Sequence, residues 1–592
     1  MANKVNKVNK VNKVNKINKK NLFILLFSLY LTTIQSSPIH ELQRKLVYYP
    51  TDSTILFKLG NEFFRAKQYN EAIIHYKKSL QQNPQDTNAL YNLGLAYLAC
   101  DKSLEKAKKL FTIISQLEPT NYKSFFKIAA IFEKNNQIDE AIDYYKKTIE
   151  INPKCTPAYT KLGVLYNTRQ QRKRALYYLE KALELSPDNI SLISLTGNVL
   201  NHLGQCKKAA DMYLQVTKLH PNNHIAFYNT GYSLKVYGEI DQAISFYKKA
   251  LEIKPDYDSA IYAIALAYLY KGDFENGWKY YQHRLIQERR NAPKLRQYIK
   301  TNNLQDKIIY LIPEGGLGDT IQFIRYIQIL KEMGADVYVL VQKPLYKLIK
   351  NCPFIDHLIL PGQKIRSYHD HASIMSLPAI FETTQETIPQ NIPYIFPDKT
   401  VEKKWKNYFQ TLSQEFYEKP PFRVGLCWQA DLKNDESRLA CAHRSIPLEK
   451  LEKLSHIPNV EFYSLQKNIS PKELEKTSEH FIIHRFGDDF DKTAGAFMDT
   501  AAIMKQLDLI ITVDTSVAHL AGAVGANVWV MLPYNTDWRW IMGRDDSPWY
   551  PKMKLFKQPK AFDWDSVIDN IFQELYHTSK SVIDKNPGSN HA

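Results

Sequence analysis

The chain has 592 residues, 44% of them hydrophobic and 23% charged, and a formal net charge of +17 at pH 7. This length exceeds what one hydrophobic core supports, so two or more folding units are expected, and the composition excludes wholesale disorder and collagen-like repeats. Six cysteines without a C-x-x-C pair indicate neither a zinc ribbon nor a disulfide framework. The charge first suggests a protein that binds nucleic acid.

Residues 1–20 carry a large share of that charge. They repeat N-K units separated by Val or Ile, with seven Lys and no acid, which leaves +10 for the rest of the chain. A low-complexity segment that repels itself and has no apolar face cannot bury a core, so we expect a basic tail without a fold.

Residues 21–37 contain an uncharged apolar run, LFILLFSLYLTTI at 22–34. A basic segment before about 13 apolar residues is typical of a signal peptide, and an uncleaved membrane anchor with its basic end in the cytoplasm is the other functional interpretation. The third interpretation is an amphiphilic extension with no role in export. The protein is therefore expected at a membrane or exported if this segment is a working signal, and in the cytoplasm if it is not.

From Pro50 the sequence becomes periodic, with prolines 34 residues apart except for one step of 35. The prolines are Pro50, Pro84, Pro119, Pro153, Pro187, Pro221 and Pro255. Two small residues keep the same spacing, the first at Gly60, Gly94, Ala129, Gly163, Gly197, Gly231 and Ala265, and the second at Ala72, Ala107, Ala141, Ala175, Ala209, Ala243 and Gly277. Two amphipathic helices of about 14 residues and two turns fill such a period, and a proline after the second helix ends it.

This period resembles that of the tetratricopeptide repeat family. The resemblance implies that residues 54–289 form an all-α superhelix of seven helix pairs, with a concave face that binds protein or peptide partners. The Lys-rich second helices also carry acids such as Glu71, Glu105 and Glu140. That mixture is typical of a solvated face, so nucleic acid is not expected as a partner.

Beyond residue 300 the period stops and buried strands alternate with helices. IIYLIP (308–313), EGGLGDT, the helical IQFIRYIQILKEMG and DVYVLV (336–341) form one βαβ pattern. Further strands are predicted at 423–428, 460–466, 507–514 and 527–532. Two such sets, at 305–400 and 421–576, predict two Rossmann-like lobes that face a cleft. Residues 577–592 are predicted to be a disordered tail.

Gly316, Gly318 and Asp319 lie in the turn after the first of these strands. Glycines allow a close approach of the backbone to a ligand, and the N–H groups of the next helix can receive an anion. Asp319 keeps two interpretations, a catalytic carboxylate or the N-cap of a helix that begins near Thr320.

Asp514, Thr515, Ser516 and His519 open a helix after another buried strand. The positive end of a helix, with two hydroxyls beside it, suits a diphosphate. The alternative is that Asp514 caps the helix and His519 is a core histidine. The pairing of a histidine with a helix start of Asp-Thr-Ser favours ligand binding.

The segments EGGLGDTIQFIRY, RSIPL, SLQK, VDTSVAHLAGAVG, LPYNTDWRW and DDSPWYPKMKLFKQ together resemble bacterial proteins that join tetratricopeptide repeats to a glycosyltransferase family 9 domain. That family contains the lipopolysaccharide heptosyltransferases, and the layout is also similar to protein O-linked N-acetylglucosamine transferase. The resemblance covers about residues 54–575 and implies a GT-B fold for the α/β part. It implies inverting transfer of a sugar from a nucleotide-sugar donor to a glycan, lipid or protein acceptor, without a metal ion or a separate cofactor.

The resemblance also assigns roles to residues. Asp319 would deprotonate the acceptor hydroxyl, and Trp428 would stack on the acceptor or line its cleft. Arg444 takes the place of a phosphate-binding basic residue, although the Trp-Pro expected after it is absent here. The donor-binding residues are expected to be Gly316, Gly318, Arg444, Gln466, Lys467, Asp514, Thr515, Ser516 and His519.

Two other hypotheses remain. The missing Trp-Pro, with Gln429 and Ala430 after Trp428, is compatible with a non-catalytic tetratricopeptide scaffold that carries a degenerate nucleotide-binding module. Nucleic-acid binding, which would weaken steeply with salt, ranks last.

Overall fold

The computed structural model describes residues 37–100, 104–281, 283, 298–300, 303–363, 365, 367–416, 420–430, 444–467 and 481–585. The chain divides into two compact units, residues 1–199 and 200–592, and each is described by itself. The predicted basic tail, and residues 21–36 of the predicted signal or anchor, lie outside the described residues. Along the part of the chain that is described, no helix is long and apolar enough to cross a membrane.

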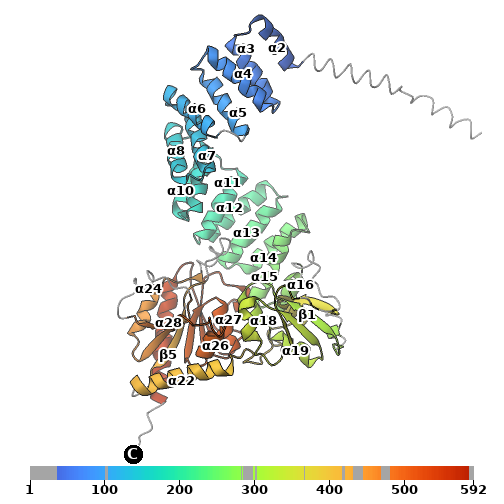
Figure 1. Cartoon of the computed structure of the whole chain (residues 1–592), viewed down its shortest axis with the longest axis vertical. Coiled ribbons are helices and arrows are strands. Elements are labelled where there is room, and N and C mark those ends of the chain that lie inside the picture. The colour runs from blue at the N-terminus through green and yellow to red at the C-terminus, as the bar shows by residue number, and fades with distance from the viewer. Residues whose placement is uncertain are drawn as a thin grey trace, which may run out of the picture. The chain divides into compact units, whose positions relative to one another are not determined.

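The first unit is built from helices that pack in consecutive pairs (Figure 1). Its helices are α2 (Pro38–Tyr48), α3 (Ser53–Arg65), α4 (Tyr69–Gln82), α5 (Thr87–Ala99), α6 (Leu104–Leu117), α7 (Tyr122–Lys134), α8 (Ile138–Ile151), α9 (Thr156–Thr168) and α10 (Arg172–Leu185). Helix α11 (Ile190–His202) spans the boundary between the two units. The second unit continues with α12 (Cys206–Leu219), α13 (His224–Tyr237), α14 (Ile240–Ile253), α15 (Asp258–Lys271) and α16 (Phe274–Tyr281).

The periodic prolines and polar caps set the ends of these helices. Helix α4 ends at Gln82, two residues before Pro84, and α8 ends at Ile151, two residues before Pro153. Asp52 starts α3 by accepting the backbone N–H groups of Thr54 and Ile55, which would otherwise lack partners. The prediction that a proline follows the end of each second helix is confirmed at these repeats.

The periodic glycines lie where the two helices of a pair touch. A Cβ atom on Gly60 would lie 2.6 Å from the ring of Tyr76, and one on Gly163 would lie 2.6 Å from Leu179. The second small residue of the period is fully buried, as at Ala72 and Ala243. The first small position therefore allows the two helices of a pair to approach closely, and the second lies in the core.

A four-stranded parallel sheet follows the repeats in the second unit. Its strands are β1 (Ile308–Ile312), β2 (Asp336–Leu340), β3 (His357–Ile359) and β4 (Asp370–Ser373), and their order across the sheet is β3-β2-β1-β4. The helical segments that follow or connect these strands are α18 (Leu317–Phe323), α19 (Tyr326–Glu332), η2 (Lys343–Leu345), α20 (Tyr346–Ile349), η3 (Ile374–Ser376) and α21 (Leu377–Ile380).

A second parallel sheet has six strands in the order β10-β9-β8-β5-β6-β7. The strands are β5 (Phe422–Cys427), β6 (Val460–Ser464), β7 (Ile483–His484), β8 (Leu509–Val513), β9 (Val528–Leu532) and β10 (Met553–Lys557). The other helices are α22 (Lys399–Phe416), α24 (Leu448–Leu451), η4 (Glu452–His456), α26 (Met498–Met504), α27 (Ser516–Ala523), η5 (Trp538–Trp540) and α28 (Trp564–Lys585). All residues of β5, β8 and β9 are buried, as expected for parallel strands covered on both faces.

Two expectations about helices are corrected. The predicted helix over 321–334 is two helices, α18 and α19, that meet at Arg325. The predicted disordered tail from residue 577 is helical as far as Lys585. Its buried positions Ile571, Leu575 and Ser579 continue one helical face past residue 577, which explains why the helix extends further.

The last repeats and the α/β part share one core in the second unit. Trp278 of α16 donates its indole N–H to the carbonyl of Thr383 at 2.7 Å, and its ring lies 5.5 Å from that of Trp538. Tyr534 donates its hydroxyl to the carbonyl of Tyr237 in α13 at 2.9 Å. The repeats at the end of the array are therefore fixed to the α/β part.

We expect Gly231→Ala to lower the free energy of unfolding of the second unit by about 1–3 kcal/mol. The added Cβ would lie 2.8 Å from the ring of Tyr247 and 3.0 Å from the carbonyl of Ala243, and the backbone cannot move away cheaply. Chemical denaturation measures the loss. Gly487→Ala is the matched control, because an added Cβ there meets nothing within 4 Å, and equal stability of the two variants would contradict this account.

Candidate functional site

The two predicted motifs lie at the carboxyl ends of parallel strands, one in each sheet. The Gly316–Asp319 turn follows β1, and the Asp514–Ser516 turn follows β8. In both sheets the strand order reverses beside that strand, between β1 and β4 in the first and between β8 and β5 in the second. In open α/β sheets such switch points leave a crevice at the carboxyl edge, where ligands bind.

Helices α18 and α27 bring these two turns into contact (Figure 1). A Cβ atom on Gly318 would lie 2.8 Å from Cδ2 of His519 and 3.4 Å from the Cα of Ser516. The absence of a side chain at residue 318 is thus what allows the two helix starts to meet. Residues almost 200 positions apart in the sequence form one polar cluster.

Asp319 is the third residue of α18, and its carboxylate is held at both oxygens. Oδ2 accepts a hydrogen bond from the backbone N–H of Gly316 at 2.5 Å, and Oδ1 accepts one from Nη2 of Arg539 at 2.5 Å. The helix begins at Leu317 with Gly316 as its N-cap residue, so Asp319 does cap the helix, but from inside the first turn. Its side chain remains 21% exposed, so the carboxylate is still within reach of a ligand.

Asp514 is buried at the end of β8, next to Arg444. Burial raises the pKa of Asp514 above its ordinary value, nearby Asp537 raises it further, and the Arg444 guanidinium acts in the opposite direction. Nη1 of Arg444 donates to the carbonyl of Asp514 at 3.1 Å and lies 3.7 Å from its carboxylate. The structure therefore places Arg444 beside the second motif.

Thr515 and His519 occupy the first turns of α27. Thr515 is the N-cap and accepts the backbone N–H of Val517 at 3.3 Å. His519 is only 5% exposed, stacks on Trp540 with ring centroids 5.4 Å apart, and pairs its Nδ1 with the hydroxyl of Tyr550 at 3.1 Å. It is packed like a core histidine, with its ring edge toward Gly318.

Gln466 and Lys467 follow β6 and have partners within the chain. Oε1 of Gln466 accepts the backbone N–H groups of Trp428 and Gln429 at 3.2 and 2.9 Å, so it holds the end of β5. Nζ of Lys467 lies 3.2 Å from the buried carboxylate of Asp491. The ion pair already balances the charge of Lys467, although its side chain is partly exposed.

Trp428 is fully buried, with 0% exposure, in the core on one side of the second sheet. Because its ring packs among residues such as Leu426, Ile446 and Val513, it is not presented to a cleft. The expectation that Trp428 stacks on or lines the acceptor site is therefore corrected to a core position.

Sequence reasoning missed Arg539 and Gln322. Arg539 donates from Nε to Oε1 of Gln322 at 2.8 Å, in addition to its bond to Asp319. The tryptophans on either side of Arg539, Trp538 and Trp540, are buried. In the sequence, Arg539 is a single arginine between two tryptophans. Such a residue cannot be told apart from one that only takes part in core packing.

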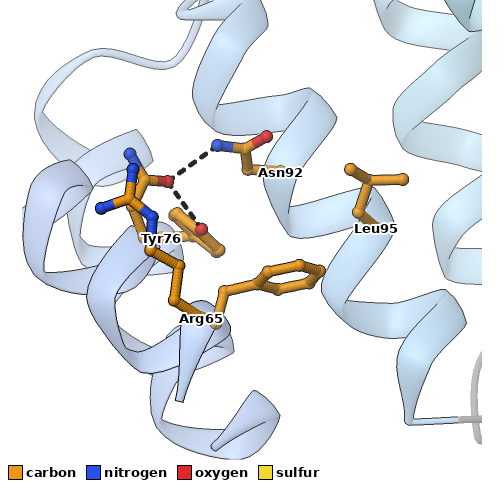
Figure 2. Close-up of a pocket in the computed structure, with 6 residues that line it drawn as sticks. Arg65, Tyr76, Asn92 and Leu95 are labelled. Carbon is orange, nitrogen blue, oxygen red and sulfur yellow. Dashed lines mark hydrogen bonds between the residues drawn. The ribbon is translucent and has the colours of Figure 1, made fainter. Parts of the chain in front are cut away.

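A pocket in the first unit lies between α3 and α5, with Tyr76 of α4 beneath it (Figure 2). Oδ1 of Asn61 accepts both the hydroxyl of Tyr76 and Nδ2 of Asn92, each at 2.8 Å. Burial raises the pKa of Tyr76 to about 12, so its hydroxyl stays a donor. The hollow holds about 250 Å³ and is lined by Asn61, Phe64, Arg65, Tyr76, Asn92 and Leu95. No residue of this pocket was singled out from the sequence.

No group of three or more His, Cys, Asp and Glu side chains in the described ranges is arranged to hold a metal ion.

The tetratricopeptide repeats are matched by family models. Models described as TPR repeat or tetratricopeptide repeat match residues 60–99, 122–155, 156–189 and 197–258. The helical part of the chain is therefore an array of tetratricopeptide repeats, a class of module that mediates binding between proteins. The part that follows it is α/β, with two parallel sheets.

Among curated relatives, protein FlbA of Caulobacter vibrioides is 23% identical over 320 residues, which are 50% of this chain and 52% of FlbA. Hsp70-Hsp90 organizing protein 2 of Arabidopsis thaliana is 28% identical over 116 residues, which are 19% of this chain and 20% of that protein. The chain thus spans about half the length of FlbA and a fifth of the organizing protein.

Solved structures similar to the chain include YrrB, described as a TPR protein with an unusual peptide-binding site. YrrB is 23% identical, and the match covers 32% of this chain and 96% of YrrB with a TM-score of 0.29. A TPR protein fragment from Cytophaga hutchinsonii is 17% identical, and the match covers 38% of this chain and 94% of that fragment with a TM-score of 0.35.

We expect the stability of the second unit to depend on His519 below neutral pH. Burial, with a smaller contribution from Arg539, lowers the pKa of His519 from 6.5 to about 3. As the pH falls through 6.5 the unfolded chain gains a proton that the folded chain does not, so stability is lost. Between pH 7 and pH 5 this group costs about 2 kcal/mol.

Denaturation of the wild type and of His519→Gln at both pH values measures this loss. The variant should lack about 2 kcal/mol of the wild-type pH dependence, whereas His577→Gln, at an exposed position of α28, should keep it. An unchanged pH dependence in His519→Gln would show that His519 is not buried in its neutral form.

Proposed function

We propose that this chain is a glycosyltransferase that transfers a sugar from a nucleotide-sugar donor to a glycan, lipid or protein acceptor. Its α/β part would be a GT-B domain of the family 9 kind, and the repeats would bind the protein or peptide that is modified or that recruits the enzyme. The contact between Gly318 and His519 carries this proposal, because it joins the two motifs at the carboxyl edges of both sheets.

The proposed chemistry follows from the charges around that contact. The backbone N–H groups at the start of α27 and the guanidinium of Arg444 would stabilise the charge that develops on the departing diphosphate. Asp319, from the opposite helix start, would take the proton of the acceptor hydroxyl as the new glycosidic bond forms. A base and a leaving group on opposite faces of the sugar would give inversion.

The second candidate is a scaffold in which the α/β part binds a nucleotide or only supports the repeats. It is favoured by the packing of the motif residues, since both oxygens of Asp319 already accept hydrogen bonds and His519 and Asp514 are buried. A scaffold of this kind would not turn over any nucleotide sugar, whether or not it binds one.

Turnover of a nucleotide sugar by the wild type separates the two candidates, and Asp319→Asn tests which group is the base. The amide keeps the shape of the carboxylate but cannot accept the proton, so the transfer rate should fall about 10²–10⁴-fold, while the affinity for the donor stays within a few-fold. Donor turnover with the full chain gives the rate, and calorimetric titration gives the affinity. Asp356→Asn, at a surface ion pair with Lys331, is the control that should keep full activity. Wild-type turnover in Asp319→Asn would rule out Asp319 as the base.

For the repeats, we propose the Asn61–Asn92 pocket as one contact for a bound peptide. Two amides and the nearby Arg65 offer donors suited to the main chain or a carboxylate of an extended peptide. A peptide selected from a random library against the full chain should lose about tenfold in affinity with Asn92→Ala. Gln81→Ala, on an exposed position of α4, should change nothing. Equal binding by both variants would place the peptide elsewhere on the repeats.

A further inference from the structure

Arg539 joins three acceptors through one buried guanidinium. It lies in η5, is 7% exposed, and donates from Nε to Gln322 at 2.8 Å, from Nη1 to Asp537 at 2.7 Å and from Nη2 to Asp319 at 2.5 Å. Gln322 and Asp319 belong to α18 beside the first sheet, whereas Asp537 comes directly before η5, between β9 and β10 of the second sheet. A planar fork of five N–H donors suits such a junction, whereas a lysine carries its three donors on a single nitrogen and lacks this spread.

The opposite charges of Arg539 and its two carboxylate partners stabilise each other in their ionised forms. Burial acts to lower the pKa of Arg539, but Asp537 and Asp319 raise it above its ordinary value. Burial acts to raise the pKa of Asp537, and Arg539 outweighs that effect and holds it below its ordinary value. The guanidinium of Arg539 is thus a permanent cation that pairs with two carboxylates, Asp537 and Asp319.

Aromatic rings hold the backbone of η5 in place. Trp538 lies 5.5 Å from Trp278 and 5.9 Å from Tyr281, both in α16 of the last repeat, and 6.3 Å from Phe323 in α18. The guanidinium of Arg539 itself lies 4.7 Å from the ring of Trp538. The last repeat and α18 therefore brace η5 between them.

We propose that Arg539 is a positioning residue for Asp319. It fixes the carboxylate in one orientation, so that the remaining lone pairs of Asp319 face the acceptor. The last repeat braces η5, which carries Arg539. The inference rests on the proposed function, in which Asp319 is the base. Each oxygen of a carboxylate has two lone pairs, and the bonds from Gly316 and Arg539 occupy one on each. The last repeat would then support the catalytic centre by bracing η5.

The test compares Arg539→Met and Arg539→Lys with the wild type in the full chain. Arg539→Met keeps an unbranched apolar side chain but removes every donor, so kcat should fall about 100-fold, as a misplaced catalytic group causes. The KM for the nucleotide sugar should change less than threefold, because Arg539 is placed against Asp319 and not against the donor. Arg539→Lys, which keeps the charge and can still reach one carboxylate, should recover part of kcat.

The matched control is Arg544→Met, on the same loop, whose guanidinium pairs with Asp546 and Gln385 away from this junction. It should keep the wild-type kcat. A wild-type kcat in Arg539→Met would overturn the proposal, as would a rise in KM with kcat unchanged.

A crystal structure of Arg539→Met separates the inference from the proposed function. The Asp319 carboxylate should rotate away from its wild-type orientation, while the backbone conformation of α18 should stay unchanged. A carboxylate that stays in place would overturn the positioning role. If the wild type transfers no sugar from any donor, the proposed function fails, and the crystal comparison still decides whether Arg539 orients Asp319.

Discussion

Two buried guanidinium groups connect the helices of the first sheet to the chain around the second sheet. Arg325, between α18 and α19, donates to the carbonyl of Trp549 at 2.7 Å and to the hydroxyl of Tyr394 at 2.8 Å. Arg539 lies in η5, beside the second sheet, and donates to Asp319 and Gln322 of α18, beside the first sheet. A buried cation has lost its hydration, so its donors must find acceptors in the protein. These two sets of bonds fix α18 against the second sheet, and the meeting of Gly318 with His519 depends on them.

The repeats extend this constraint toward the N-terminus. Within the second unit, Nζ of Lys557 donates to the hydroxyl of Tyr270 at 2.5 Å, and the backbone N–H of Met542 donates to the carbonyl of Tyr270 at 2.8 Å. Helix α15 is therefore bonded both to β10 and to the chain that follows η5. A change in the last repeats would act directly on η5, and also on β10 and on the chain near Thr383. The repeat array and the proposed catalytic centre share this physical link.

Much of the fold could be predicted because buried parallel strands are continuous apolar runs. The runs at 308–313, 336–341, 423–428, 460–466, 507–514 and 527–532 correspond to β1, β2, β5, β6, β8 and β9. Strands β3, β4 and β7 were missed because they have three, four and two residues and contain His or Asp, so they form no apolar run. Strand β10 was missed because Lys554 and Lys557 interrupt its apolar residues. The repeats were the most predictable part, since glycines such as Gly60, Gly163 and Gly231 make the same kind of close contact once in each period.

The candidate site was less predictable than the fold. Local patterns placed Asp319 and His519 at helix starts, but only the resemblance suggested that they meet, because no local rule relates residues of different sheets. Arg539 lies 220 positions from Asp319, and its partners are known only once the chain is folded. Trp428 was misassigned because the resemblance and its place at a strand end suggested the acceptor cleft, whereas its side chain is buried in the core.

Binding of nucleotide sugars to the full chain tests the central claim most directly. Calorimetric titration with UDP-, GDP- and ADP-sugars should find at least one that binds, and a bulky change at the helix contact, Gly318→Leu, should abolish that binding because it separates α18 from α27. No binding by any sugar nucleotide, or equal binding by Gly318→Leu, would contradict the claim that the two helix starts form a donor site.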